Sequence, residues 1–445
     1  MSEIMIDLRL RFKIPDTHLT INSLIYGIKE SSREIHGTII GTLMKALEEK
    51  VIEEMICTNP GRYKRNGYQR KARTLKSSLG TIRFRFAQLL DTQGDRKRTI
   101  VPLAEFLAIP SYTHYLEESL EPAIGLSVHA SYRRSTSEIE RIQGTTMSHT
   151  TVHRRLQHFA AHQNPFGNLK DTPFRLLLVD GTKVHLQGPS GEDLGQAEMR
   201  WALASLGPRS KFEPIGFWIN TTWAQIRQEI QERLEYEKIE VLFSDGGPGI
   251  EENLLRKGMD HQRCQLHGKR DFPYLLYADG VKKTEQASFI EKLKSIPALQ
   301  FTKSQLEKIC PEDHHLITVL AEKTEKGFHE LLDALDPHTY PKARAYIQNL
   351  IEPVTTFLRW WLYKGEAIPL TTNAVESAFS QVCNRIKRIG RRWSEHGLLN
   401  WLKVTFYKIF KPQCWNLVWY KNNHQVPFVK LISIQSSYVW CESIT

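Results

Sequence analysis

The sequence predicts an α/β core with an all-helical insertion, preceded by an α-helical region that contains a small β element. Two apolar runs of strand length, FRLLLV (174–179) and IEVLF (239–243), flank the amphipathic helical pattern TWAQIRQEIQERLEY, an order typical of an α/β sheet. From residue 283 to about 368 the apolar spacing is helical throughout, and the helical pattern NAVESAFSQVCNRIKRIGRRW follows. Shorter strand patterns, KVHLQ, GQAEMRWALASL, KFEPIGFWIN and HQRCQLH, complete the predicted sheet.

These changes of pattern divide the chain into six regions. We predict a helical N-terminal region (1–55), a basic β-containing region (56–110), a region like a helix-turn-helix (111–165), an α/β domain (166–282 and 371–410), a helical insertion (283–370) and a tail (411–445). The tail is aromatic and strand-prone from Pro412 onward, and it has no assigned role.

Composition limits the function classes. The 445 residues are 41% hydrophobic and 24% charged, as in ordinary globular proteins, and no uncharged apolar run approaches the ~18 residues that span a bilayer. We therefore expect no membrane partner. Six cysteines without a C-x-x-C pair argue against a disulfide scaffold and a self-contained zinc ribbon, so we expect a reducing, cytoplasmic setting. A net charge of +11 predicts a polyanionic partner, with nucleic acid the first choice.

The stretch from residue 62 to 85 concentrates this positive charge. It contains no acid. At its end and just beyond, Ile82, Phe84 and Phe86 alternate with polar residues, which predicts a short strand with one apolar and one cationic face. Interleaved tyrosines favour DNA contact over the alternative of a merely solvated charged face. The predicted DNA-binding residues here are Arg62, Lys64, Arg65, Arg70, Lys71 and Arg73.

The segment SYRRSTSEIERIQGTTMSHTTVHRRLQHFA has the outline of a helix-turn-helix. Ser135 or Thr136 is predicted to cap the first helix, Gly144 to form the turn and Ser148 to cap the second helix. The second helix would place Arg154 and Arg155 in a major groove of double-stranded DNA. An ordinary helix pair is the alternative interpretation.

Three acids stand where a carboxylate cluster needs them. Asp180 follows the first apolar run, Asp245 follows the second, and Glu376 lies in the first turn of the helix after the insertion. Carboxyl ends of neighbouring parallel strands meet at one sheet edge, and ligands bind there. Each acid also has a structural alternative: a type I′ hairpin turn at Asp180-Gly181, a cap by Asp245 of a helix near Pro248, and a capping box from Asn373 to Glu376.

A carboxylate triad suits hard divalent cations. Mg²⁺ and Mn²⁺ prefer oxygen ligands, so Asp180, Asp245 and Glu376 are the predicted catalytic and metal-binding residues. Two such ions can activate a water or a 3′-hydroxyl and stabilise the leaving oxygen of a phosphodiester.

Four blocks in order, LLLVDGTKV, VLFSDGGPGI, RCQLHGKRDF and TTNAVESAFSQVCNRIKRIGRRW, resemble the signature blocks of the Mutator-like insertion-sequence DDE transposases of bacteria and archaea. The resemblance spans roughly residues 60 to 410. It implies a ribonuclease-H-like catalytic domain interrupted by an all-helical insertion, with Asp180, Asp245 and Glu376 as the catalytic triad. Cys264 and His267 match the Cys-x-x-His element of that group, with a structural or DNA-end-positioning role.

Further residues are weighed beside this resemblance. One Cys-x-x-His pair supplies only two zinc ligands, so a buried cysteine beside a hydrogen-bonded histidine is the simpler interpretation. Trp360 and Trp361 are expected in the core, or alternatively against a flipped base at a transposon end. Cations after Glu376 are expected along its helix facing phosphates, with a solvated helix as the alternative: Arg385, Lys387, Arg388, Arg391 and Arg392.

The sequence therefore predicts a DNA transposase that cleaves the ends of an insertion sequence and joins their 3′-hydroxyls to target DNA. Its partners would be the terminal inverted repeats and the target, and by the resemblance it would act as a homodimer or larger assembly. The alternatives are a non-catalytic DNA-binding regulator or decayed transposase, and a ribonuclease-H-like nuclease that acts on hybrids or junctions.

Overall fold

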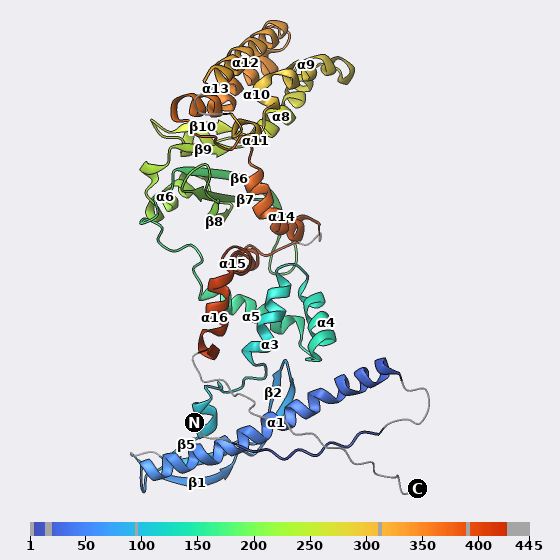
Figure 1. The fold of residues 1–445 in the computed structure, drawn as a ribbon, viewed down its shortest axis with the longest axis vertical. Coiled ribbons are helices and arrows are strands. Elements are labelled where there is room, and N and C mark those ends of the chain that lie inside the picture. The colour runs from blue at the N-terminus through green and yellow to red at the C-terminus, as the bar shows by residue number, and fades with distance from the viewer. Residues whose placement is uncertain (1–3, 14–19, 94–96, 310–313, 389–391, 425–445) are drawn as a thin grey trace. The chain divides into compact units, whose positions relative to one another are not determined.

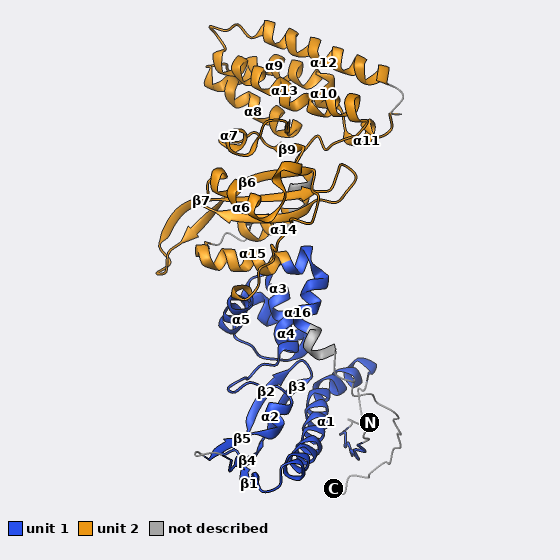
Figure 2. Cartoon of the chain, turned by 90° about the vertical axis from the view of Figure 1, so that its left-hand side faces the viewer, with its two compact units in different colours: residues 1–159, 407–445 blue, residues 160–406 orange. Residues whose placement is uncertain are grey.

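The computed structural model describes residues 4–13, 20–93, 97–309, 314–388 and 392–424. The chain forms two compact units, one made of residues 1–159 and 407–445 and the other of residues 160–406 (Figure 2). We call them the N-terminal unit and the sheet unit. None of the helices in the described ranges is both long and apolar enough to cross a bilayer.

The N-terminal unit is organised around helix α1 (Ile21–Thr58). The helix begins at Thr20, whose side chain accepts a hydrogen bond from the Ser23 amide in a capping box. Its inner face packs on the hairpin of β2 and β3, and a three-stranded sheet β1-β4-β5 lies beside it in the same unit. The remaining bounds are β1 (Tyr63–Tyr68), β2 (Arg73–Ser77), β3 (Gly80–Phe84), β4 (Ala87–Asp91), β5 (Arg98–Ile100) and α2 (Pro102–Phe106).

The predicted two-faced strand is confirmed. Along β3, Ile82 and Phe84 are buried while Thr81 and Arg83 are exposed, and Phe86, two residues after the end of the strand, is fully buried. Apolar alternation at period two therefore placed the strand and its buried face correctly.

Three helices follow, α3 (Glu117–Ser127), α4 (Tyr132–Gln143) and α5 (His149–Ala161). Gly144 ends α4 with φ of 67°, in the left-handed region that favours glycine, so the predicted turn is confirmed. The predicted cap at Ser135 or Thr136 is wrong, because Ser131 accepts the hydrogen bond from the Arg134 amide one turn earlier. Ser148 accepts from the Thr151 amide at 3.1 Å, as a cap of the second helix should.

The strand-prone interpretation of the tail is wrong as far as residue 424. Residues Pro412–His424 form helix α16, which packs on α3. Trp419 stacks on Phe159 with ring centroids 5.1 Å apart, so its aromatic residues serve helix packing rather than a sheet. Residues 425–445 lie outside the described ranges.

The sheet unit contains a five-stranded sheet in the order β10-β9-β6-β7-β8 (Figure 1). β6, β7 and β8 form an antiparallel meander, whereas β9 runs parallel to β6 and β10 parallel to β9. This mixed sheet with its helices is compatible with the predicted ribonuclease-H-like core. Its strands are β6 (Leu176–Gln187), β7 (Asp193–Ser205), β8 (Glu213–Ile219), β9 (Val241–Ser244) and β10 (Asp260–Arg263).

Two strand predictions need correction. LLLV of the first apolar run and KVHLQ belong to the single strand β6, which begins at Leu176, because backbone pairing with β7 continues through Asp180 and Gly181. The expected strand HQRCQLH ends at Arg263, since Cys264 is the N-cap of helix α8 (Gln265–Ala278).

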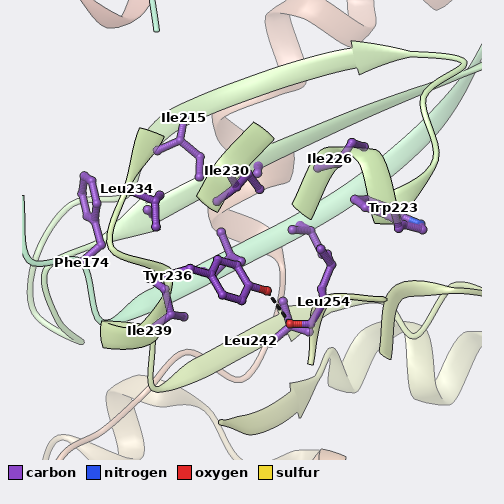
Figure 3. Close-up of a cluster of buried hydrophobic side chains, with 14 of the residues drawn as sticks. Phe174, Ile215, Trp223, Ile226, Ile230, Leu234, Tyr236, Ile239, Leu242 and Leu254 are labelled. Atoms are coloured by element: carbon purple, nitrogen blue, oxygen red, sulfur yellow. Dashed lines mark hydrogen bonds between the residues drawn. The ribbon is translucent and has the colours of Figure 1, made fainter. Parts of the chain in front are cut away.

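One face of the sheet is covered by α6 (Trp223–Arg233) and α7 (Ile250–Leu254). Ile226 and Ile230 of α6 pack with Leu242 of β9, and Tyr236 donates a hydrogen bond to the carbonyl of Leu254 (Figure 3). Leu177 and Val179 of β6 belong to this cluster, so their neighbours Leu178 and Asp180 face the opposite side of the sheet.

The predicted helical insertion is present as a group of helices packed around α13 (Pro341–Lys364). The core between these helices contains Leu331, Ile347 and Leu350. Its helices are α9 (Lys283–Ser295), α10 (Pro297–Gln300), α11 (Lys303–Leu306), α12 (His314–Ala334) and α13 (Pro341–Lys364). After it, one long helix was expected, but α14 (Asn373–Cys383) gives way to a π-helical turn (Asn384–Arg388), and α15 (Glu395–Phe410) begins separately.

Candidate active site

Asp180 and Asp245 both follow the segments through which the parallel strands β6 and β9 pair. β6 and β9 pair with a constant offset of 65 residues, from Leu176–Val241 to Leu178–Phe243, and the same offset separates Asp180 from Asp245. The pairing of β6 with β9 ends at Leu178–Phe243 and β9 ends at Ser244; continued by two residues, the register would bring the two aspartates level and on the same face of the sheet.

Local hydrogen bonds orient both carboxylates. Oδ1 of Asp180 accepts from the Gly181 amide at 2.7 Å, and Oδ1 of Asp245 accepts from the Gly247 amide at 2.9 Å. Asp180 is 8% exposed in mid-strand, so the alternative of a hairpin turn there is wrong. Asp245 does not cap α7 either, because the N-cap of that helix is Gly249.

Helix α14 covers the face on which the aspartates lie. Trp201 is the register partner of Asp180, and its indole stacks on Phe379 of α14 with centroids 4.3 Å and planes 1° apart. Glu376 stands one turn before Phe379 in the first turn of α14, as predicted. The side chain of Glu376 lies outside the described residues.

The carboxylates of Asp180 and Asp245 are donors of the kind that a hard divalent cation prefers. Two carboxylates at matched positions supply the oxygen ligands that Mg²⁺ and Mn²⁺ prefer, and the predicted third carboxylate belongs to the helix above them. Among the described side chains no group of three His, Cys, Asp or Glu is arranged to hold a metal. The fit therefore rests on the pair Asp180 and Asp245.

Cys264 links the two acid-bearing segments. Its amide donates to the Ser244 carbonyl at 2.8 Å, directly before Asp245, and its sulfur accepts from both the amide and the hydroxyl of Thr372 at 3.4 Å, four residues before Glu376. Burial raises the pKa of the Cys264 thiol, but hydrogen bonds from His267 and Thr372 outweigh it and bring the pKa to about 7. The same contact raises the pKa of His267 against the opposing effect of burial.

Trp360 and Trp361 are placed in the core. They are 2% and 4% exposed, and their indole nitrogens donate to Asp260 at 2.7 Å and to the Leu306 carbonyl at 3.2 Å. In this arrangement neither ring offers a face to a DNA base, and the core interpretation describes their contacts.

The cations predicted to bind DNA occupy different settings. In the N-terminal unit Arg62 pairs with Asp91 at 2.8 Å and Arg73 lies over the ring of Phe86. The others there are exposed, namely Lys64, Arg65, Arg70, Lys71, Arg154 and Arg155.

In the sheet unit the prediction for Arg385 needs correction. Arg385 is 2% exposed, with its guanidinium over Trp393 and Trp401, so it faces the interior rather than phosphates. Arg392 lies beyond the π-helical turn and pairs with Asp193 at 2.9 Å. The side chains of Lys387 and Arg388, and the whole of Arg391, lie outside the described residues.

Known proteins show only weak similarity to the chain. No protein-family profile and no curated protein matches the chain. A solved structure of the Drosophila P element transposase strand transfer complex matches 66% of this chain and 92% of its own chain, with 12% identity and a TM-score of 0.34.

Two further residues contribute hydrogen bonds to the site. Thr372, which holds the Cys264 sulfur, and Ser244, which precedes Asp245, were not among the predicted site residues. Ser244 directly precedes Asp245 and Thr372 lies in the same sequence block as Glu376, but hydrogen bonds between distant segments leave no local pattern in the sequence.

Proposed function

We propose that the chain is a DDE-type DNA transposase that cleaves insertion-sequence ends and joins their 3′-hydroxyls to target DNA. The observation that supports this most directly is that Asp180 and Asp245 are separated by the same offset as the paired residues of β6 and β9, while α14, the helix that contains Glu376, covers the sheet face of Asp180. The four sequence blocks that resemble Mutator-like transposases contain these same three acids.

Asp180, Asp245 and Glu376 would hold two Mg²⁺ or Mn²⁺ ions. When bound, such ions activate the attacking water or 3′-hydroxyl and stabilise the leaving oxygen. The protein's own part is to hold the carboxylates in place. Asp180 is held in a buried position in mid-strand, where its carboxylate accepts from the Gly181 amide. Asp245 lies in a loop in which its carboxylate accepts from the Gly247 amide, and the Phe379 ring anchors α14.

The N-terminal unit would bind double-stranded DNA. Its helix pair α4 and α5 has the left-handed glycine turn and the capped second helix of a helix-turn-helix, and Arg154 and Arg155 are exposed on that second helix. The exposed cations of β1 and the following turn would add sequence-independent phosphate contacts. Action as a homodimer or larger assembly on paired ends is part of this proposal.

The test uses the full chain and a DNA fragment that carries the inverted repeats flanking its gene. With Mg²⁺, strand cleavage at the repeat ends is expected, and Asp180→Ala and Asp245→Ala should each abolish cleavage while binding in a mobility-shift assay persists. Glu213→Gln is the matched control, because Glu213 is an exposed acid at the opposite edge of the same sheet. Cleavage by Asp180→Ala would refute the proposal, and binding without cleavage by the unmodified chain would favour a non-catalytic regulator.

A further inference from the structure

A chain of hydrogen bonds runs from the surface to the loop of Asp245. Oε1 of Glu251 on α7 lies 3.2 Å from Nδ1 of His261 on β10, and Nε2 of His261 lies 2.8 Å from the hydroxyl of Ser244 at the end of β9. The Ser244 hydroxyl in turn accepts from the Gly246 amide at 3.1 Å. The bond to His261 lowers the pKa of Glu251. This series of hydrogen bonds therefore holds Ser244 and Gly246, the residues on both sides of Asp245.

The order Glu–His–Ser resembles the relay of a hydrolase, but the burial of the serine argues for a different role. Ser244 is fully buried and His261 is 7% exposed, so no substrate can reach the hydroxyl. Ser244 also shares a sheet face with Leu242 in the core under α6 and α7, whereas Asp245 points to the other face. A nucleophile must be accessible, so the hydroxyl can act only on the loop.

A second side chain of β10 supports the same loop. Nε of Arg263, two residues after His261, donates to the Asp245 carbonyl at 3.3 Å. Gly246 has φ of 84°, and a Cβ there would lie 2.2 Å from Nε of Arg263, so the loop is closed tightly against the guanidinium. His261 and Arg263, which lie on the same face of β10, thus both support the loop: His261 contacts the Ser244 hydroxyl and Arg263 contacts the Asp245 carbonyl.

We infer that His261, oriented by Glu251, is a positioning residue that acts through Ser244 to fix the Asp245 carboxylate for divalent-cation binding. The inference rests on the proposed function, since it assumes that Asp245 is a metal ligand. Groups behind metal ligands commonly change metal affinity or activity by 10–100-fold when removed. Ser244→Ala should remove both the acceptor for Gly246 and the partner of His261, and so loosen Asp245.

The experiment measures Mn²⁺ binding to the full chain by calorimetry without DNA, together with thermal unfolding. Ser244→Ala is expected to weaken Mn²⁺ binding about tenfold or more. Glu251 is half exposed, so its variants should fold: Glu251→Ala should weaken binding several-fold, whereas Glu251→Gln keeps an acceptor for Nδ1 and should bind as the unmodified chain does.

Tyr236→Phe is the matched control. It removes a buried hydrogen bond to α7 in the same core without touching the Asp245 loop, so it should lower the unfolding temperature and leave Mn²⁺ binding unchanged (Figure 3). Unaltered Mn²⁺ binding by both Ser244→Ala and Glu251→Ala would overturn the inference. Failure of the proposed function looks different, because then the unmodified chain would bind no Mn²⁺ or Asp245→Ala would bind it equally well.

Discussion

Trp201 of β7 and Phe379 of α14 form a parallel stack, with ring centroids 4.3 Å and planes 1° apart, and both side chains are 2% exposed. Trp201 is the register partner of Asp180 on β6, and Phe379 lies one turn after Glu376 on α14. The stack therefore fixes the distance between α14 and the part of the sheet that contains Asp180.

Removing the stack should loosen α14. Phe379→Ala is expected to lower the free energy of unfolding by about 3 kcal/mol, the usual cost of deleting a buried aromatic ring, and to reduce cleavage more than DNA binding. Trp201→Phe keeps an aromatic ring in place and should cost less. Urea unfolding followed by fluorescence tests both, with Ser380→Ala, an exposed neighbour on the same helix, as control. Equal stability of Phe379→Ala and Ser380→Ala would contradict the anchoring role.

Cys264 should titrate near neutrality. Its pKa of about 7 lies below the ordinary thiol value of about 8.5, so thiolate absorbance at 240 nm should appear with a midpoint near pH 7 and be missing in Cys264→Ser. Because the thiol pKa is lower in the folded than in the unfolded state, the Cys264 thiolate stabilises the folded protein fully at pH values above the pKa of the unfolded state. This stabilisation is lost as the pH falls through about 7. His267, whose pKa is raised, contributes in the opposite sense, below its unfolded value. A Cys264 midpoint above pH 8.5 would show that the hydrogen bonds from His267 and Thr372 do not outweigh burial.

The sequence predicted the positions of the aspartates better than the strand that contains Asp180. The apolar runs place Asp180 and Asp245 after buried segments, and the 65-residue spacing turns out to equal the strand register. An Asp-Gly pair suggests a turn, yet β6 continues through it, because Asp180 and Gly181 pair with Trp201 and Arg200 of β7. Tertiary pairing of this kind overrides local turn preference.

Charge alone misled the interpretation of the residues after α14. The basic residues around Arg385 in the sequence predict a DNA-binding cation, but Trp393 and Trp401 from the next segment enclose its guanidinium. The tail shows the same limit, since its aromatic residues look strand-prone and become helical through packing with α3 and Phe159.

In the N-terminal unit Glu121 should hold α16 in place. Its carboxylate, 8% exposed, accepts from Lys408 Nζ at 2.8 Å and from Trp415 Nε1 at 2.6 Å. Glu121→Ala leaves both donors without this acceptor and should lower the free energy of unfolding by about 2 kcal/mol, less than a fully buried pair because Lys408 is one-third exposed. Limited proteolysis should then cut near α16. Glu140→Ala, an exposed acid on α4, is the control, and equal protease resistance of the two variants would refute the assignment.

The buried and exposed arginines should separate in DNA-binding assays. Arg154→Ala with Arg155→Ala removes two exposed cations of α5, so affinity for duplex DNA should fall and the slope of log affinity against log salt should decrease by up to about 2, roughly 0.9 for each phosphate that the protein ceases to neutralise. Arg385→Leu should leave both quantities unchanged, because the Arg385 guanidinium faces two indoles rather than phosphate. Fluorescence anisotropy from 50 to 200 mM salt, about the range over which such interactions are weakened, tests both variants. A larger drop in affinity for Arg385→Leu than for the double variant would contradict the buried placement of Arg385, whereas a lowered unfolding temperature with intact DNA binding would agree with it.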